Sequence, residues 1–187
     1  MPEINTRSLS TNQTLSKFEI TENFTCIRFI DQNKERFELE FNLERGTSFN
    51  TFFIRSNEEL FIIHPPEKQY LDLLNQVISS FFDQFKLNKI NIITGHINPQ
   101  IIETIKNIST QFQNITITCS NPGFKLISEL WNQRNPKLEN FVETQLPKIN
   151  IIKKELKIEL ESFSLELIPI PTARWPGGLI VYERYQE

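Results

Sequence analysis

The hydrophobic period of the sequence changes at Pro65-Pro66, and this change constrains the fold more than any other feature. Before the prolines, apolar residues form short runs or alternate with polar ones, as in strands, at 25–30, 37–41, 51–54 and 60–63. After them, apolar residues recur every three or four positions from Tyr70 to Phe85, which predicts an amphipathic helix. Within that helix Phe81, Phe82 and Phe85 are more typical of a core face than of a docking stripe.

Two strand-then-helix units follow. The apolar runs 90–93 and 115–119 predict strands, and the pairs Asn98-Pro99 and Asn121-Pro122 each combine a helix cap with a proline for the first helical position. This alternation predicts an α/β fold (α+β by some schemes), with a parallel or mixed sheet covered by helices. Ligands of such folds gather at the carboxyl ends of strands, and His96 falls just past such an end.

The two ends of the chain and one internal stretch give weaker signals. Residues 1–17 lack hydrophobic periodicity and predict a polar arm, whereas 132–150 fits either a surface excursion or a helix with a loop. Strands are expected at 156–160, 165–170 and 179–182. Because only nine residues, 179–187, remain from the start of the last strand, its sheet edge has no successor to cover it, which favours a chain lacking its second half.

Composition narrows the function classes. The chain has 20 Lys+Arg against 23 Asp+Glu, a net charge of -3, so no general nucleic-acid surface is expected. Cys26 and Cys119 are too few for a disulfide framework and too far apart for a Cys-x-x-Cys pair, which favours a reducing compartment. The sequence shows neither a secretory signal nor an apolar stretch of about 18 residues, so we expect a cytoplasmic protein without a membrane span.

Five ordered landmarks carry a family resemblance. They are Arg45-Gly-Thr-Ser-Phe-Asn50, Ile63-His-Pro-Pro66, Gly95-His-Ile-Asn-Pro-Gln100, Cys119-Ser-Asn-Pro-Gly123 and Pro171-Thr-Ala-Arg-Trp-Pro176. In this order they resemble the metallo-β-lactamase-like domain of flavodiiron proteins, most closely the cyanobacterial and plastid branch of diflavin flavoproteins. The resemblance implies an αββα sandwich over 18–187, incomplete at the C-terminus, with no flavodoxin-like or flavin-reductase domain in this chain.

The resemblance also implies a function for the parent protein. Members of this branch are similar in being oxygen reductases that take electrons from NAD(P)H or photosynthetic donors, make water and protect the photosynthetic chain. The parent uses a diiron centre and FMN. The implied partners of this chain are flavodoxin-like and flavin-reductase domains, or a paralogue subunit that has the full ligand set, in a homo- or heterodimer.

The ligand positions implied by the resemblance are altered. His96 matches the first residue of a His-x-Glu-x-Asp motif, but Asn98 and Gln100 stand at the positions of the two acids. The histidine before Trp-Pro is replaced by Arg174. Amides bind iron weakly, and a guanidinium is always protonated and repels a cation. We therefore expect no metal, no cofactor and no catalytic residue in this chain, with these four side chains lining a polar pocket.

Alternatives remain open at this stage. The chain could be a stand-alone non-catalytic binding or regulatory module that kept the fold, so whether it is an enzyme is undecided. A metal-dependent hydrolase fits poorly because a His-x-His-x-Asp-His motif is absent. His64 is either a strand-end structural residue or a ligand, and Arg174 beside Trp175 is either a cation-π stack, an anion clamp or a surface arginine.

Overall fold

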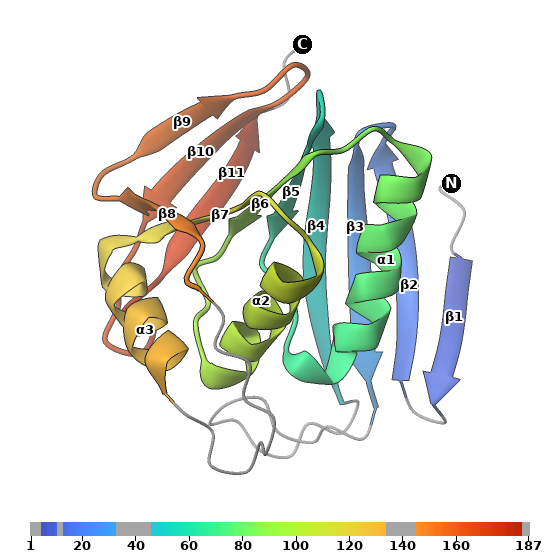
Figure 1. Cartoon of the computed structure of the whole chain (residues 1–187), viewed down its shortest axis with the longest axis horizontal. Helices are drawn as coiled ribbons and strands as arrows, with labels where there is room; N and C mark the ends of the chain where they lie inside the picture. The colour runs from blue at the N-terminus through green and yellow to red at the C-terminus, as the bar shows by residue number, and fades with distance from the viewer. Residues whose placement is uncertain (1–4, 11–12, 33–45, 134–144, 185–187) are drawn as a thin grey trace.

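Two sheets and one helical layer make up the fold (Figure 1). The computed structural model describes residues 5–10, 13–32, 46–133 and 145–184. The large sheet has eight strands in sequence order: β1 Asn5–Ser10, β2 Gln13–Thr21, β3 Phe24–Asp31, β4 Thr47–Ser56, β5 Glu59–Ile63, β6 Lys89–Ile93, β7 Ile115–Ser120 and β8 Lys148–Ile152. The small sheet has the order β11-β10-β9, with β9 Leu156–Glu159, β10 Ser164–Pro169 and β11 Leu179–Arg184.

Strand direction changes midway through the large sheet. Strands β1 to β5 pair antiparallel, whereas β5 to β8 pair parallel. The parallel half needs crossover connections, which are α1 Leu71–Gln84, preceded by the 3-10 turn Lys68–Tyr70, then α2 Pro99–Gln111 and α3 Asn121–Asn132. The prediction of a mixed sheet with strand-helix alternation is confirmed.

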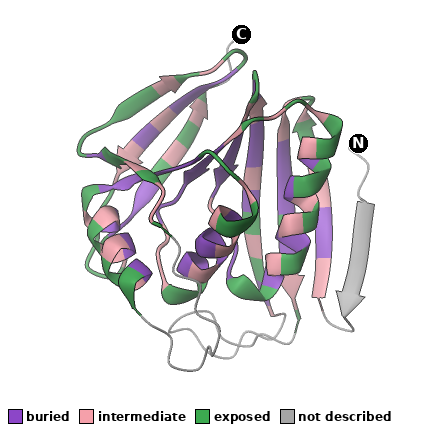
Figure 2. Cartoon of the chain, in the orientation of Figure 1, coloured by how far each residue is buried: buried purple, intermediate pink, exposed green. Residues whose placement is uncertain are grey.

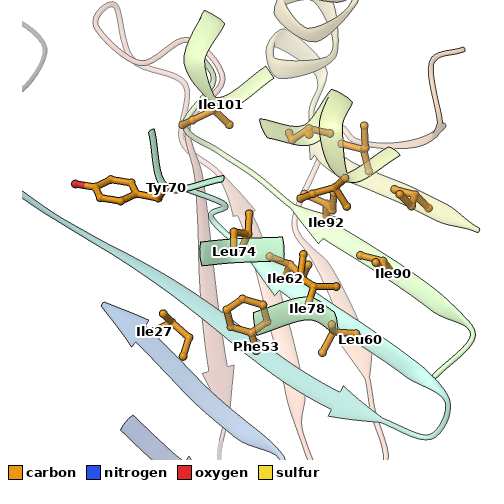
Figure 3. Close-up of a cluster of buried hydrophobic side chains, with 14 of the residues drawn as sticks. Ile27, Phe53, Leu60, Ile62, Tyr70, Leu74, Ile78, Ile90, Ile92 and Ile101 are labelled. Carbon is orange, nitrogen blue, oxygen red and sulfur yellow. The ribbon is translucent and has the colours of Figure 1, made fainter. Parts of the chain in front are cut away.

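The central strands of the large sheet are buried on both faces, with one hydrophobic core on each side (Figure 2). The first core joins the sheet to α1, α2 and α3 and includes Phe53, Ile62, Leu74 and Ile92 (Figure 3). The second core lies between the two sheets and includes Ile63 of β5. Neighbouring residues of a strand point to opposite faces, so Ile62 and Ile63 serve different cores. This explains the continuous apolar run of β5.

Three expectations about the elements are corrected. The polar arm expected over 1–17 is wrong where the structure describes it, because β1 pairs with β2 and Leu15 is buried. Ser120, rather than Asn121, caps α3: its hydroxyl accepts a hydrogen bond from the Gly123 N–H at 3.2 Å. Of the stretch 132–150, expected as a surface excursion or a helix with a loop, residues 134–144 lie outside the described residues, and 148–150 belong to β8, which pairs with β7.

The other expected elements are confirmed within a few residues at each end. The helix predicted from Tyr70 is α1, and Asn98-Pro99 begins α2 as expected. The strand expected at 37–41 and Arg45 of the first landmark lie outside the described residues. All three α-helices of the described residues pack on one face of the large sheet, with the small sheet against the other, so the layers run helix, sheet, sheet.

Candidate functional site

The candidate site lies where the parallel strands β5, β6 and β7 end. His64 follows β5 directly, His96 lies in the loop between β6 and α2, and Ser120 is the last residue of β7. Since these strands are parallel, their carboxyl ends meet at one edge of the sheet. The loop 170–178 between β10 and β11 reaches this edge, because the Ser120 hydroxyl donates to the Gly177 carbonyl oxygen at 3.0 Å.

Gly95 allows the small sheet to approach this edge. A Cβ atom on Gly95 would lie 2.5 Å from the Leu179 nitrogen and 2.8 Å from the Leu179 oxygen. Only a residue without a side chain permits this contact with backbone atoms. Gly95 therefore fixes how closely the first residue of β11 packs against the loop that carries His96.

His96 is held against an aromatic ring. The His96 and Trp175 ring centroids are 4.6 Å apart at an interplanar angle of 58°, and the Thr94 hydroxyl donates to the His96 carbonyl oxygen at 2.9 Å. The Arg174 guanidinium carbon lies 5.4 Å from the centroid of the Trp175 ring, within the range of a cation-π contact. Trp175 thus contacts both His96 and Arg174.

Asn98 is committed to the start of α2. Its side-chain oxygen accepts a hydrogen bond from the Ile101 N–H at 2.9 Å, as expected of a helix cap. Its amide nitrogen lies 3.4 Å from the Glu67 Oε1 and 3.4 Å from the His96 Nε2. Glu67 is buried, and an ionised carboxylate at that depth needs hydrogen-bond donors such as this amide.

The four predicted pocket residues are brought together only in part. His96 and Asn98 are in contact, and Trp175 contacts both His96 and Arg174. Gln100 is exposed on the first turn of α2, and its carbonyl oxygen accepts from the Thr104 hydroxyl at 3.3 Å. Glu67 was not predicted as a partner of Asn98, because it lies 31 positions from Asn98 and becomes its neighbour only through the fold.

His64 is a buried histidine in an uncommon backbone conformation. Its φ is 55°, its N–H donates to the Ile93 carbonyl oxygen at 2.9 Å, and its own carbonyl oxygen accepts from the Thr51 hydroxyl at 2.9 Å. Burial, with a smaller contribution from the charge of His96, lowers the pKa of His64 to about 4. The imidazole is therefore neutral near pH 7, and its Nδ1 is buried without a hydrogen-bond partner.

Two further classes of site are tested by the structure. Within residues 5–10, 13–32, 46–133 and 145–184, no group of three or more His, Cys, Asp and Glu side chains is placed to hold a metal ion. Cys26 and Cys119 are buried free thiols, and burial raises the pKa of Cys119 to about 12, so it carries no thiolate near pH 7.

None of the described helices is long and apolar enough to cross a membrane.

The sequence is similar to curated cyanobacterial proteins. It is 30% identical over 167 residues to diflavin flavoprotein A 5 of Nostoc sp., in an alignment that covers 88% of this chain and 26% of the relative. It is 26% identical over 168 residues to diflavin flavoprotein A 1 of Synechocystis sp., covering 88% and 26%. The chain therefore spans about a quarter of the length of these relatives. No protein-family model matches it.

The fold is similar to solved structures of related proteins. A metal-soaked Flv1 flavodiiron core from Synechocystis sp. superposes with a TM-score of 0.75 and 25% identity, covering 92% of this chain and 40% of that one. A fragment of diflavin flavoprotein A 5 from Nostoc sp. gives 0.72 and 25%, covering 92% and 63%. A flavoprotein from Thermotoga maritima, 18% identical, shares the fold with a TM-score of 0.64 over 98% of this chain and 40% of that one.

Proposed function

We propose that this chain, which is similar to cyanobacterial diflavin flavoproteins in sequence and to flavodiiron cores in fold, is the metallo-β-lactamase-like part of a diflavin oxygen reductase of the flavodiiron family, and that its own residues hold no diiron centre. The parent reaction is electron transfer from NAD(P)H or a photosynthetic donor to oxygen, which protects the photosynthetic chain. This chain supplies the scaffold of that reaction, and the redox groups belong to other domains or subunits.

The hydrogen bonds of the Asn98 side chain are the observation that supports the proposal most directly. Iron pairs are held by imidazoles and ionised carboxylates, because these ligands donate strongly and neutralise the charge of the metal. The Asn98 oxygen instead accepts from the Ile101 N–H, and its NH₂ group, which cannot ligate a cation, faces Glu67 and His96. The described residues therefore offer one imidazole at the altered motif, and they do not fit a pair of irons.

The charge of Arg174 acts in the same direction. A guanidinium remains protonated at any working pH, so it repels a dication from the cavity that the motif would form. Its contact with the Trp175 ring keeps it at the loop that also contacts His96. A further ligand set would have to overcome this positive charge as well as the missing carboxylates.

Electron supply implies partners. We propose that FMN comes from a flavodoxin-like domain, either of the same parent protein or of a paralogue subunit that has the full ligand set, in a homo- or heterodimer. In that assembly this chain contributes no reacting group. The chain contributes to the complex by binding the partner through its surface, and the residues of the altered motif take no part in the reaction.

An oxygen-consumption assay tests the proposal. The purified chain is loaded with ferrous iron under anaerobic conditions, mixed with a reduced flavin donor and transferred to an oxygen electrode. We expect the rate of the flavin donor alone, and we expect co-expression with a flavin-carrying homologue to yield a complex that contains flavin. Consumption above that background, abolished by His96→Ala, would refute the proposal.

The alternative is a stand-alone non-catalytic binding module. One observation favours it: Ile180 and Tyr182, two positions apart on the edge strand β11, share one face of that strand and are 44% and 54% exposed, so they offer apolar area to a partner. A metal-free chain that captures no flavin-carrying subunit would favour this module over the oxygen-reductase assembly.

A further inference from the structure

A cavity of about 200 Å³ lies between the two sheets. Its wall consists of six apolar side chains from both sheets, and two polar side chains, His64 and Glu183, complete it. Two of the apolar residues are Phe24 and Phe52, whose ring centroids are 6.0 Å apart. At roughly 30 Å³ per water molecule, the cavity has room for a small organic molecule.

Glu183 turns a carboxylate toward the core between the sheets. It lies opposite Leu165 in the β10-β11 ladder, and Leu165 is fully buried. Val181 shares its face, because alternate residues of a strand point the same way. The Glu183 Oε1 is buried and has no hydrogen-bond partner. A buried carboxylate oxygen without a donor is costly, so its presence requires an explanation.

His64 presents the second unpartnered atom. Its Nδ1 is buried and makes no hydrogen bond, although the backbone N–H and C=O of the same residue are both satisfied. The lowered pKa of His64 keeps the ring neutral near pH 7, so the imidazole brings no positive charge to the cavity. Both residues therefore line one cavity, and none of the described side chains in its wall carries a positive charge.

We propose that this cavity binds a small primary amine in its protonated form, with the ammonium group donating to Glu183 and His64 and the apolar part packed against Phe24 and Phe52. An ammonium group has three hydrogen-bond donors, and its positive charge compensates the negative charge of the Glu183 carboxylate. Aromatic rings in the wall favour the same charge through cation-π attraction. An anion is excluded by the carboxylate, and a neutral ligand leaves its charge uncompensated.

A competing account assigns no ligand to the cavity. An inward-pointing charge on an edge strand discourages pairing with other sheets, and β11 is an edge strand of the small sheet. Water would then fill the cavity. That account predicts no preference for a cation over a neutral molecule of the same shape.

The test compares benzylamine, benzyl alcohol and benzoate, which share one apolar ring and differ in charge. The full chain is titrated near neutral pH by isothermal calorimetry, with chemical shifts of labelled backbone amides used to locate the binding. We expect saturable binding of benzylamine that is about tenfold or more tighter than that of the alcohol, with none of benzoate. Shifts should be concentrated around β4, β5 and β11.

Variants locate the binding. Glu183→Gln keeps the side-chain shape without the charge and should weaken benzylamine about tenfold, while Glu159→Gln, an exposed acid of the same small sheet, should leave it unchanged. His64→Asn suits the positive φ and should also weaken binding. Equal affinities for benzylamine and benzyl alcohol, absence of saturable binding, or binding unaffected by Glu183→Gln would each overturn the proposal.

Discussion

At the residue scale, Asn98 makes one contact that is local in the sequence and one that is not. Its oxygen caps α2 and its amide nitrogen faces the buried Glu67. The capping role was predictable from the Asn-Pro pair, because a cap acts within one turn of the chain. The contact with Glu67 was not, because a buried neighbour 31 positions away leaves no local pattern.

The capping role of Asn98 predicts a measurable loss of stability. Asn98→Ala removes the acceptor for the Ile101 N–H and should lower the free energy of unfolding by about 1 kcal/mol in urea denaturation. Asn98→Ser restores a capping oxygen and should recover most of that loss. Equal stability of wild type and the alanine variant would mean that the cap contributes nothing.

The buried His64 predicts a pH dependence of stability. Its pKa is about 4 in the folded chain against an ordinary value of 6.5, so the unfolded chain binds more protons between these values. The stability that the neutral ring contributes is therefore complete above about pH 6.5 and is lost as pH falls through 4, by ~3 kcal/mol.

Urea denaturation at a series of pH values checks this. His64→Asn, which tolerates the positive φ, should flatten the fall in stability across this window relative to wild type. A wild-type profile as flat as that of the variant would contradict the burial of a neutral imidazole.

At the scale of elements, the central strands and the helices were predictable, and the edges of the large sheet were not. The run 60–63 is apolar throughout because β5 is buried on both faces, and the period of α1 follows from one buried face. Strands β1 and β2 are rich in Ser, Thr and Asn, so their pairing depends on β3 rather than on their own pattern. Polar edge strands of this kind give little hydrophobic signal.

The meeting of β6 and β11 through Gly95 predicts a steric effect. Gly95→Ala places a Cβ atom 2.5 Å from the Leu179 nitrogen, so the small sheet has to shift. We expect about 2 kcal/mol or more of lost stability, measured by thermal or urea unfolding. Ser79→Ala on the exposed side of α1 is the matched control and should change stability by less than about 0.5 kcal/mol. A Gly95 variant as stable as this control would refute the tight contact.

At the scale of the whole molecule, the fold is similar to that of solved flavodiiron cores, as the resemblance implies. The layers follow from the alternating pattern, and their order agrees with solved cores at TM-scores of 0.75 and 0.72. The gathering of His96, Trp175 and Arg174 depends on the loop between β10 and β11, which lies far along the chain from His96, so a linear pattern does not place it. The Glu183 carboxylate in the cavity between the sheets was missed for the same reason.

Iron binding tests the central claim most directly. The purified chain is incubated anaerobically with excess ferrous iron, passed over a desalting column and measured by mass spectrometry for metal, beside a denatured sample of the same chain. The account predicts iron no higher in the folded chain than in the denatured control, since the altered motif offers one imidazole, two amides and a guanidinium. Two irons retained per folded chain, and lost in His96→Ala, would contradict it.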